Sequence, residues 1–390
     1  MLERDEIKDG LPQGVARGRG AGLNPGNRFE PVRLHVLGEH LDNQLREHPC
    51  GQQVRTEVYE DASRSVLNHV DSPDLGFNWT VNPYRGCEHG CIYCYARPGH
   101  EYLALSSGLD FETQIFAKPD APRLLREALT KPRWQGEVIV FSGVTDCYQP
   151  IEARLAITRA CLEVCAELAQ PVSIVTKNRL VLRDLDLLSE LSRFNAASVA
   201  VSITTLDNTL AANMEPRASA PRERLETVRQ LAAAGIPVHV MVAPIVPALN
   251  ESEVPAILQA AADAGARDAG YILLRMPHQI KALFEDWLRR HFPERADKVL
   301  NSMRETHGGE LYKSVFFERQ RGTGVRAEHL AQAFTLFKRR AGLGHAEGPR
   351  TSPDGTRHTN ASRGGGWSRL SSAEFLRRRS LGSGQLGLFG

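Results

Sequence analysis

Short apolar runs rich in β-branched residues alternate with longer amphipathic stretches along the middle of this chain. The runs predict strands at residues 78–82, 137–141, 172–176, 198–204, 238–243 and 271–275. The stretches predict helices at residues 153–169, 184–192, 221–234 and 251–264. Near-continuous apolar strands joined by helices are typical of a parallel sheet built from βαβ units. We therefore expect an α/β fold, a partial (β/α)6 barrel that stays open, with a doubly wound sheet as the alternative.

The alternating region is flanked by segments of different composition. Residues 1–75 are polar, with a Gly/Arg-rich patch at 17–28, and they predict an extended, partly ordered N-terminal extension. The (β/α)6 core is expected at 76–295, followed by a helical C-terminal extension at 296–340. Residues 341–390 are rich in Gly, Ser and Arg, which predicts a flexible, basic tail.

The overall composition is that of a globular protein, because 42% of the 390 residues are hydrophobic and 24% are charged. No apolar run approaches the roughly 18–20 residues that span a bilayer. The charged N-terminus lacks the apolar core of a secretion signal. Seven cysteines without a paired pattern suit a reducing compartment. We expect a cytoplasmic protein, and with a net charge of +2 any attraction to nucleic acid must come from local patches.

Three cysteines, Cys87, Cys91 and Cys94, lie within eight residues in the spacing C-x3-C-x2-C, with Tyr93 just before the last. Thiolates this close on one loop can converge on a single metal centre. The loop follows the first predicted strand, and reactive residues collect at the carboxyl ends of such strands. Three thiolates, unlike four, leave one iron of a [4Fe-4S] cluster open to an outside ligand.

Structural zinc is the main alternative at these cysteines. Zinc prefers four tetrahedral ligands, commonly from two separated pairs. No second C-x-x-C or His pair follows, although His89 or His100 could supply the fourth ligand. Burial in a core explains the cysteines poorly, because Glu88 and Gly90 are polar or turn-forming neighbours.

The motif C-x3-C-x-aromatic-C after a first strand, with the (β/α)6 pattern behind it, resembles the radical S-adenosylmethionine (SAM) superfamily over about residues 75–290. The resemblance implies that Cys87, Cys91 and Cys94 bind three irons of a [4Fe-4S] cluster and that SAM chelates the fourth. One electron then cleaves SAM to methionine and a 5′-deoxyadenosyl radical, which abstracts hydrogen from a substrate. It further implies that Tyr93 lies close to the adenine and that a flavodoxin or ferredoxin donates the electron.

A closer resemblance is to the branch that includes spore photoproduct lyase, a DNA-repair enzyme. It rests on three strand-end segments, FSGVTDCYQPIE at 141–152, TKN at 176–178 and SITT at 202–205. By this resemblance Ser142, Lys177 and Ser202 contact SAM, Lys177 offering a cation to its carboxylate and the serines hydroxyl groups. The alternatives are a helix N-cap for each serine and a solvated strand-end charge for Lys177.

Cys147 is the candidate catalytic residue, because the resemblance implies that a cysteine at the barrel mouth returns a hydrogen atom to a product radical. A packed strand-end thiol is the alternative. Asp146 and Glu152 are acids at the same mouth, and they either accept hydrogen bonds from SAM or substrate or cap the following helix. Arg217 offers a cation for a phosphate or carboxylate, with an ion pair to Glu215 as one alternative.

The chain ends in a peptide with spaced leucines and a Leu-Phe pair, which suits apolar pockets on a partner. It resembles the Q-L-[S/D]-L-F pentapeptide by which bacterial replication and repair proteins bind the DNA sliding clamp. The resemblance implies clamp contacts from Gln385, Leu386, Leu388 and Phe389.

The sequence therefore predicts a radical SAM enzyme similar to spore photoproduct lyase, acting in DNA repair or nucleic-acid modification. One alternative is radical SAM modification of a protein or small molecule. A second, from another class, is a non-catalytic iron–sulfur or zinc regulator.

Overall fold

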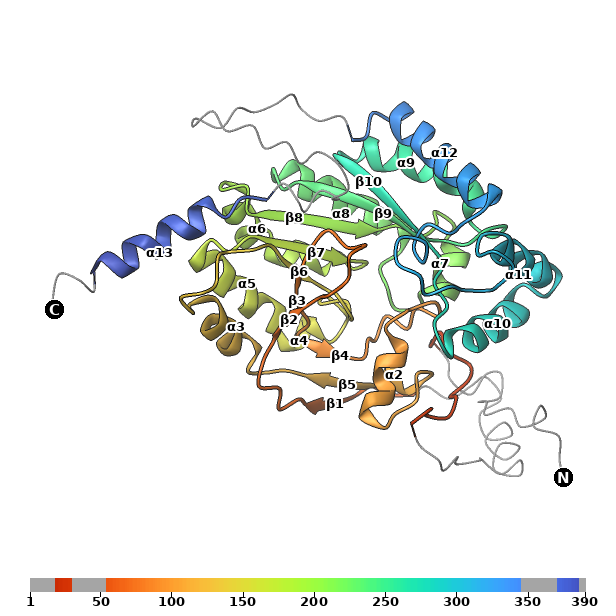
Figure 1. Ribbon diagram of the computed structural model, residues 1–390, viewed down its shortest axis with the longest axis horizontal. Coiled ribbons are helices and arrows are strands. Elements are labelled where there is room, and N and C mark those ends of the chain that lie inside the picture. Colours follow the sequence, from red (N-terminus) through yellow and green to blue (C-terminus); the bar gives the residue numbers. More distant parts are fainter. Residues whose placement is uncertain (1–17, 30–53, 345–369, 386–390) are drawn as a thin grey trace.

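The computed structural model describes residues 18–29, 54–344 and 370–385 (Figure 1). Its main sheet has seven strands in the order β10-β9-β8-β7-β6-β3-β2. Their bounds are β2 (Leu67–His69), β3 (Trp79–Val81), β6 (Ile139–Phe141), β7 (Val172–Thr176), β8 (Ala197–Ser202), β9 (Val238–Ile245) and β10 (Asp268–Leu273). All pairs from β3 to β10 are parallel, and β2 runs antiparallel to β3 at one edge.

The order of the six parallel strands follows the chain in one direction. A doubly wound sheet would reverse direction at a switch point, and this sheet does not. Right-handed crossovers therefore place the connecting helices on one face, as in a (β/α) barrel. Among the residues that the structure describes, β2 and β10 form the two edges of the sheet and do not pair with each other. The barrel is therefore open, and the prediction of a partial (β/α)6 fold is confirmed. All six predicted strands are present, although β10 begins three residues earlier than expected, at Asp268.

The helices that cover the sheet form one layer in which neighbours pack on each other (Figure 1). They are α3 (Ala121–Leu129), α4 (Glu152–Leu155), α5 (Ile157–Leu168), η2 (Arg179–Asp184), α6 (Leu185–Ser192), α8 (Pro221–Ala233) and α9 (Val254–Asp263), the last preceded by η3 (Glu251–Glu253). The helix predicted at 153–169 is broken at Ala156, whose φ is 52°. The break occurs because the Glu152 carboxylate accepts from the backbone N–H of Thr158 at 3.0 Å and caps the new start.

A second, smaller sheet frames the cysteine loop. It has the order β1-β5-β4, from β1 (Glu57–Glu60), β4 (Tyr84–Arg85) and β5 (Gln114–Ala117). Two short helices, η1 (Arg97–Leu103) and α2 (Asp110–Thr113), complete this frame, and α7 (Asn208–Met214) reaches it from the main barrel. The sequence did not predict this sheet, because strands of two to four residues carry no detectable period.

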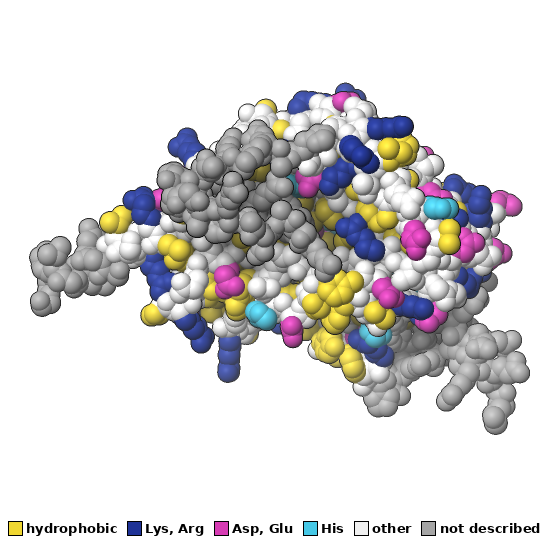
Figure 2. Space-filling model, turned by 45° about the horizontal axis from the view of Figure 1, so that its top comes forward, with side chains coloured by type: hydrophobic (Ala, Val, Ile, Leu, Met, Phe, Trp, Pro, Cys, Tyr) yellow, Lys and Arg dark blue, Asp and Glu magenta, His cyan; other side chains and the backbone are white. Residues whose placement is uncertain are grey.

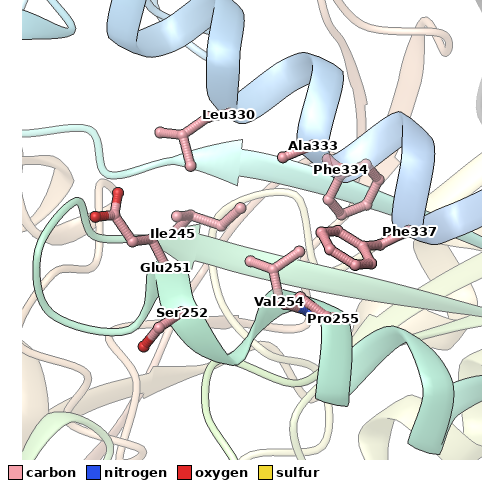
Figure 3. A pocket seen from close by; sticks show the side chains of 9 residues that line it. All are labelled: Ile245, Glu251, Ser252, Val254, Pro255, Leu330, Ala333, Phe334 and Phe337. Carbon is pink, nitrogen blue, oxygen red and sulfur yellow. The ribbon is translucent and has the colours of Figure 1, made fainter.

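The C-terminal extension packs against the edge at β10. It contains α10 (Ile280–His291), η4 (Pro293–Arg295), α11 (Ala296–Glu305) and α12 (Val325–Arg340). A cavity of about 230 Å³ lies between α12 and α9. Figure 3 shows its mainly apolar lining, which includes Phe334 and Phe337. Cys87, Cys91 and Cys94 do not line it, so it belongs to the helix packing and not to the predicted site.

The flexible tail predicted for 341–390 is wrong for its part at 370–385, where the structure has α13 (Ala373–Gln385). Phe375 is buried, with 3% exposure. Arg378 donates to the carbonyl oxygens of Ala166 and Glu167, at 2.9 and 2.8 Å. Those carbonyls belong to the last turn of α5, where a cation is favourable, so the tail docks on that helix end. Leu386, Leu388 and Phe389 of the predicted clamp peptide lie outside the described residues.

The main hydrophobic core lies between the sheet and its helix layer. Over the described parts of the chain, no helix has the length and apolar character needed to cross a membrane. On the face drawn in Figure 2, basic and acidic side chains are interspersed. Any binding of an anionic partner at this face therefore depends on particular groups and not on a single basic surface.

Candidate active site at the carboxyl ends of the strands

The cysteine loop begins just after β4 and is shaped by two glycines. Gly86 and Gly90 have φ of 76° and 65°, a region that favours glycine. The backbone N–H of Cys87 donates to Phe111 at 2.9 Å, and that of Ile92 donates to Met214 at 3.0 Å. The loop is thus fixed to α2 on one side and to the end of α7 on the other.

A fully buried ion pair supports the loop from behind. Arg97 pairs with Glu112 at 2.5 Å, and neither side chain is exposed. The same guanidinium donates to four loop carbonyls at 2.8–3.2 Å, those of Gly90, Cys91, Ser107 and Gly108. Glu112 in turn accepts from the backbone of Gly20 at 2.9 Å. A Cβ at Gly20 would lie 1.9 Å from the Gly90 oxygen, so this N-terminal segment needs glycine to reach the loop.

The three thiols lie close together in a desolvated environment. Burial raises the pKa of Cys87, and the neighbouring charges of Asp146, Cys91 and Cys94 raise it further. Burial likewise raises the pKa of Cys91 and of Cys94. Such sulfurs become thiolates only beside a strong positive charge, which a bound metal centre supplies. The Arg97 charge and the backbone groups of Ala96 and Arg97 act to lower the pKa of Cys94.

The histidines that zinc would need are engaged elsewhere. His100 Nε2 lies 3.0 Å from the Gln114 carbonyl oxygen, and burial lowers the pKa of this imidazole to about 4. His89 Nε2 lies 3.3 Å from the Asn178 amide. Within residues 18–29, 54–344 and 370–385, no group of three or more Cys, His, Asp or Glu side chains is arranged around a single ion. The thiolates of a [4Fe-4S] cluster have a different requirement, because each binds a different iron.

Lys177 reaches the cysteine loop from the end of β7. Its Nζ lies 5.8 Å from the Tyr93 ring centroid and 3.9 Å from Glu215 Oε1. Although burial raises the pKa of Cys91, the Lys177 charge acts to lower it, as it does for Cys94. The Lys177 side chain is 16% exposed and therefore keeps some contact with solvent.

Glu215 is the centre of a buried polar network under that ammonium. Burial acts to raise the pKa of Glu215, but the charges of Arg224 and Lys177 hold it at about 2. Glu215 accepts hydrogen bonds from the Tyr93 hydroxyl and from Thr204, the latter at 2.6 Å, and pairs with Arg224. Tyr93 is thereby fixed in the interior beside Cys91.

The two predicted serines lie at strand ends. Ser142 follows β6 with φ 77°, and its hydroxyl accepts from the backbone N–H of Cys147 at 2.8 Å. Ser202 is the last residue of β8, is buried, and its carbonyl oxygen accepts from Arg224 at 3.1 Å. Both residues lie at the carboxyl ends of parallel strands, and the Ser142 hydroxyl already has a local partner.

Cys147 lies in the main hydrophobic core and has 0% exposure. Burial and the charge of Asp146 raise its pKa well above the ordinary thiol value. Asp146 accepts from Thr176 Oγ1 at 2.9 Å and from the Lys177 backbone at 2.8 Å, while Glu152 caps α5. Asp146 thus binds the end of β7 and Glu152 the start of α5, so both carboxylates have partners within the protein.

Sequence reasoning missed the role of Glu215. It was expected only as an alternative ion-pair partner of Arg217, whereas Arg217 pairs with Glu88 at 3.3 Å. The available signal was a Glu between Met214 and Pro216 in a segment that follows a strand and a short helix. Nothing in that spacing indicates burial, since the partner Arg224 comes from the following helix.

Comparisons with known proteins agree with this geometry. The sequence model of the Radical SAM superfamily matches residues 81–261. An uncharacterized protein of Mycobacterium tuberculosis is 38% identical over 239 residues, which cover 60% of this chain and 70% of that protein. An uncharacterized protein of Methanocaldococcus jannaschii is 28% identical over 199 residues, which cover 51% of this chain and 71% of that protein.

Solved structures of spore photoproduct lyase have the same fold. The lyase complexed with dinucleoside spore photoproduct has a TM-score of 0.51 at 17% identity, covering 73% of this chain and 78% of the lyase. A mutant with bound AdoMet and dinucleoside spore photoproduct has a TM-score of 0.50 at 18% identity, covering 73% and 77%. The chain therefore belongs to the radical SAM superfamily, as an enzyme that uses a [4Fe-4S] cluster and SAM and has the fold of spore photoproduct lyase.

Proposed function

We propose that Cys87, Cys91 and Cys94 hold the [4Fe-4S] cluster and that Lys177 binds the SAM carboxylate beside it. The observation that carries this assignment is the Lys177 ammonium, which Glu215 holds next to the cysteine loop. When bound, the cluster and SAM supply a one-electron cleavage of the sulfonium, which leaves methionine and a 5′-deoxyadenosyl radical. The ionised Glu215 keeps Lys177 in place, and the burial of Cys87 and Cys91 keeps water from their sulfurs.

Three further side chains complete the proposed SAM site. Tyr93, fixed by Glu215 and facing Lys177, borders the adenine. Ser142 and Ser202, at the ends of β6 and β8, offer hydrogen bonds to the ribose or the amino acid portion. This arrangement follows the rule that ligands of parallel sheets bind outside the carboxyl ends of the strands.

Anaerobic reconstitution with iron, sulfide, SAM and a reductant tests the assignment. The full chain should form 5′-deoxyadenosine, and each Cys→Ala change at Cys87, Cys91 or Cys94 should abolish the product and lower the iron content. Cys161→Ala is the matched control, because Cys161 is buried in the core at a position outside the loop. A reconstituted protein that binds iron but produces no 5′-deoxyadenosine would contradict the proposal and favour the regulator.

We propose nucleic acid as the substrate class, with DNA repair or nucleic-acid modification as the outcome. The support is the fold shared with spore photoproduct lyase, which has been solved with a dinucleoside lesion. Deuterated DNA and RNA oligomers should transfer deuterium to 5′-deoxyadenosine, as measured by mass spectrometry. Transfer only from deuterated protein or small molecules in cell extract would indicate the other substrate classes.

Cys147 stays a candidate for returning hydrogen to the product radical. Its complete burial means that the thiol reaches a substrate only if the loop at 142–147 opens, so the relay depends on that movement. Cys147→Ser should then slow turnover but leave the initial hydrogen abstraction intact. Equal turnover by the variant would leave Cys147 as a packing residue.

Two partners complete the proposal. A flavodoxin or ferredoxin would supply the electron, and replacing the chemical reductant by such a protein tests that supply. The terminal peptide, Gln385, Leu386, Leu388 and Phe389, would bring the enzyme to a DNA sliding clamp. Removing residues 385–390 should abolish binding to purified clamp, and no binding by the intact chain would end this idea.

A further inference from the structure

Three large aromatic rings are exposed beside the cysteine loop. Tyr95 directly follows Cys94 in the chain, and Phe316 and Phe317 lie in the loop between α11 and α12. Their exposed fractions are 47%, 44% and 56%. Single exposed apolar residues are common, but exposed rings grouped with basic residues mark interaction sites. We call Tyr95, Phe316 and Phe317 the aromatic rim.

Two arginines stack on the aromatic rim. Arg275 Cζ lies 4.8 Å from the Tyr95 ring centroid, and Arg319 Cζ lies 4.6 Å from the Phe316 ring centroid. The backbone N–H of Leu273, two residues before Arg275, donates to the carbonyl oxygen of Gln320 at 2.9 Å. The segment that carries Arg275 therefore lies beside the loop that carries Phe316 and Arg319.

The loop that carries the two phenylalanines is held in an unfavourable conformation. Phe317 has φ 68°, a left-handed backbone conformation that bulky side chains rarely adopt. Its backbone N–H donates to Asp74 at 3.4 Å, and Arg319 donates to the same carboxylate at 2.7 Å. Strain of this kind persists where surrounding contacts enforce it, and it clusters at binding sites. Here the enforced conformation keeps both rings in contact with solvent.

Arg275 has charge available for a ligand. It forms no ion pair with any residue that the structure describes, and within that part its buried Nε has no hydrogen-bond partner. Arg319 differs, because Asp74 neutralises it. The aromatic rim therefore offers flat apolar surfaces, and Arg275 adds a cation without an ion-pair partner among the described residues. Both lie near Cys94, which precedes Tyr95 in the chain.

We propose that the aromatic rim stacks unpaired nucleobases and that Arg275 contacts a phosphate of the same strand. Bases stack on aromatic and guanidinium faces when they are unpaired, whereas the bases of a duplex cover each other's faces. The inference rests on the proposed function, since it takes nucleic acid as the substrate, and it narrows that class to single-stranded or locally opened strands.

Fluorescence anisotropy with labelled DNA tests the stacking, using the full chain reconstituted without oxygen. The wild type should bind a single strand more tightly than its duplex. The double variant Phe316→Ala/Phe317→Ala should weaken single-strand binding at least about fivefold. This factor corresponds to the lower end of the free energy that one stacked base contributes. Tyr59→Ala is the control, because Tyr59 is a partly exposed ring of the small sheet. Thermal unfolding of each variant verifies that it is folded.

The salt dependence of binding tests the phosphate contact. Arg275→Gln should reduce the slope of log K against log salt by about 0.7, the value for one phosphate of a single strand. The inference would be overturned if the double phenylalanine variant bound the single strand as tightly as the wild type does. It would also be overturned if the wild type bound single strand and duplex equally well, or bound neither. 5′-Deoxyadenosine formation by the wild type without DNA is measured separately. Its absence would refute the radical chemistry, while the binding data would still decide the role of the rim.

Discussion

Arg319 donates to Asp74 at 2.7 Å across a separation of 245 residues in the chain. Asp74 precedes β3 near one edge of the open sheet, whereas Arg319 belongs to the loop that hydrogen-bonds β10 at the other edge, through Leu273 and Gln320. This pair therefore spans the gap that an incomplete barrel leaves between its first and last strands. The C-terminal extension closes the side of the mouth that a complete barrel would close with further strands.

Asp74→Asn should destabilise the fold by about 2–3 kcal/mol, because it removes a charged partner from a largely buried ion pair. Chemical unfolding, followed by circular dichroism, measures the difference in free energy. Asp71→Asn is the matched control, since Asp71 is exposed on the same segment and should change stability by less than about 0.5 kcal/mol. Equal effects of the two changes would mean that the pair does not stabilise the closed gap.

Glu215→Gln should destabilise the protein by about 3–5 kcal/mol, because Arg224 would remain buried without its partner. The control is Glu223→Gln, which removes an exposed pair with Arg179 and should cost less than about 1 kcal/mol. If both variants unfold at the same denaturant concentration, the buried Glu215–Arg224 pair contributes no more to stability than the exposed pair does.

The same residue predicts a pH dependence of stability. The folded pKa of Glu215 is about 2, below the unfolded value of about 4.3. Its contribution is therefore complete above the unfolded pKa and is lost as the pH falls toward the folded value. Unfolding curves between these pH values should show a steeper loss of stability in the wild type than in Glu215→Gln. Parallel curves would contradict the low folded pKa.

Much of the fold was predictable because its signals are local. In the main sheet, strands β3, β6, β7, β8 and β9 are apolar runs that each end in a polar segment, and Lys177 follows such an end. Parallel strands bring those ends together, which is why Lys177 and the cysteine loop could be placed at one mouth before the structure was known. The structure has them side by side, with the Lys177 Nζ 5.8 Å from the centroid of the Tyr93 ring.

Contacts between distant segments were not predictable. The interaction of Gly20 with Glu112 depends on a backbone approach that no sequence period encodes. The docking of α13 depends on Arg378 reaching the end of α5, although the tail has the composition of a flexible segment. The burial of Glu215 depends in the same way on Arg224 from another helix. In each case a polar group finds its partner only after the elements have packed.

Arg97→Lys should weaken retention of the metal centre, because a lysine cannot replace the guanidinium that serves four carbonyls and Glu112. Iron and sulfide content after reconstitution, and the rate of iron loss to a chelator, measure this effect. Arg126→Lys is the control, since Arg126 pairs with Glu167 on the surface at 2.6 Å. Iron loss at the wild-type rate in Arg97→Lys would show that the loop keeps its shape without this support.

Lys177→Gln should weaken SAM binding about 10- to 150-fold, the range that corresponds to losing a hydrogen bond to a charged group. The loss follows from geometry, because the ammonium near Tyr93 and Glu215 is the cation proposed to meet the SAM carboxylate. Lys177→Arg should recover part of the affinity, whereas Lys131→Gln, an exposed lysine after α3, should leave it unchanged. Isothermal titration of the reconstituted protein with SAM gives the dissociation constants, and iron content confirms that each variant carries its cluster. If Lys177→Gln has a normal iron content and binds SAM as tightly as the wild type does, the SAM carboxylate binds another residue. The proposed role of Lys177 would then be wrong, and Ser142 and Ser202 would be the remaining proposed contacts.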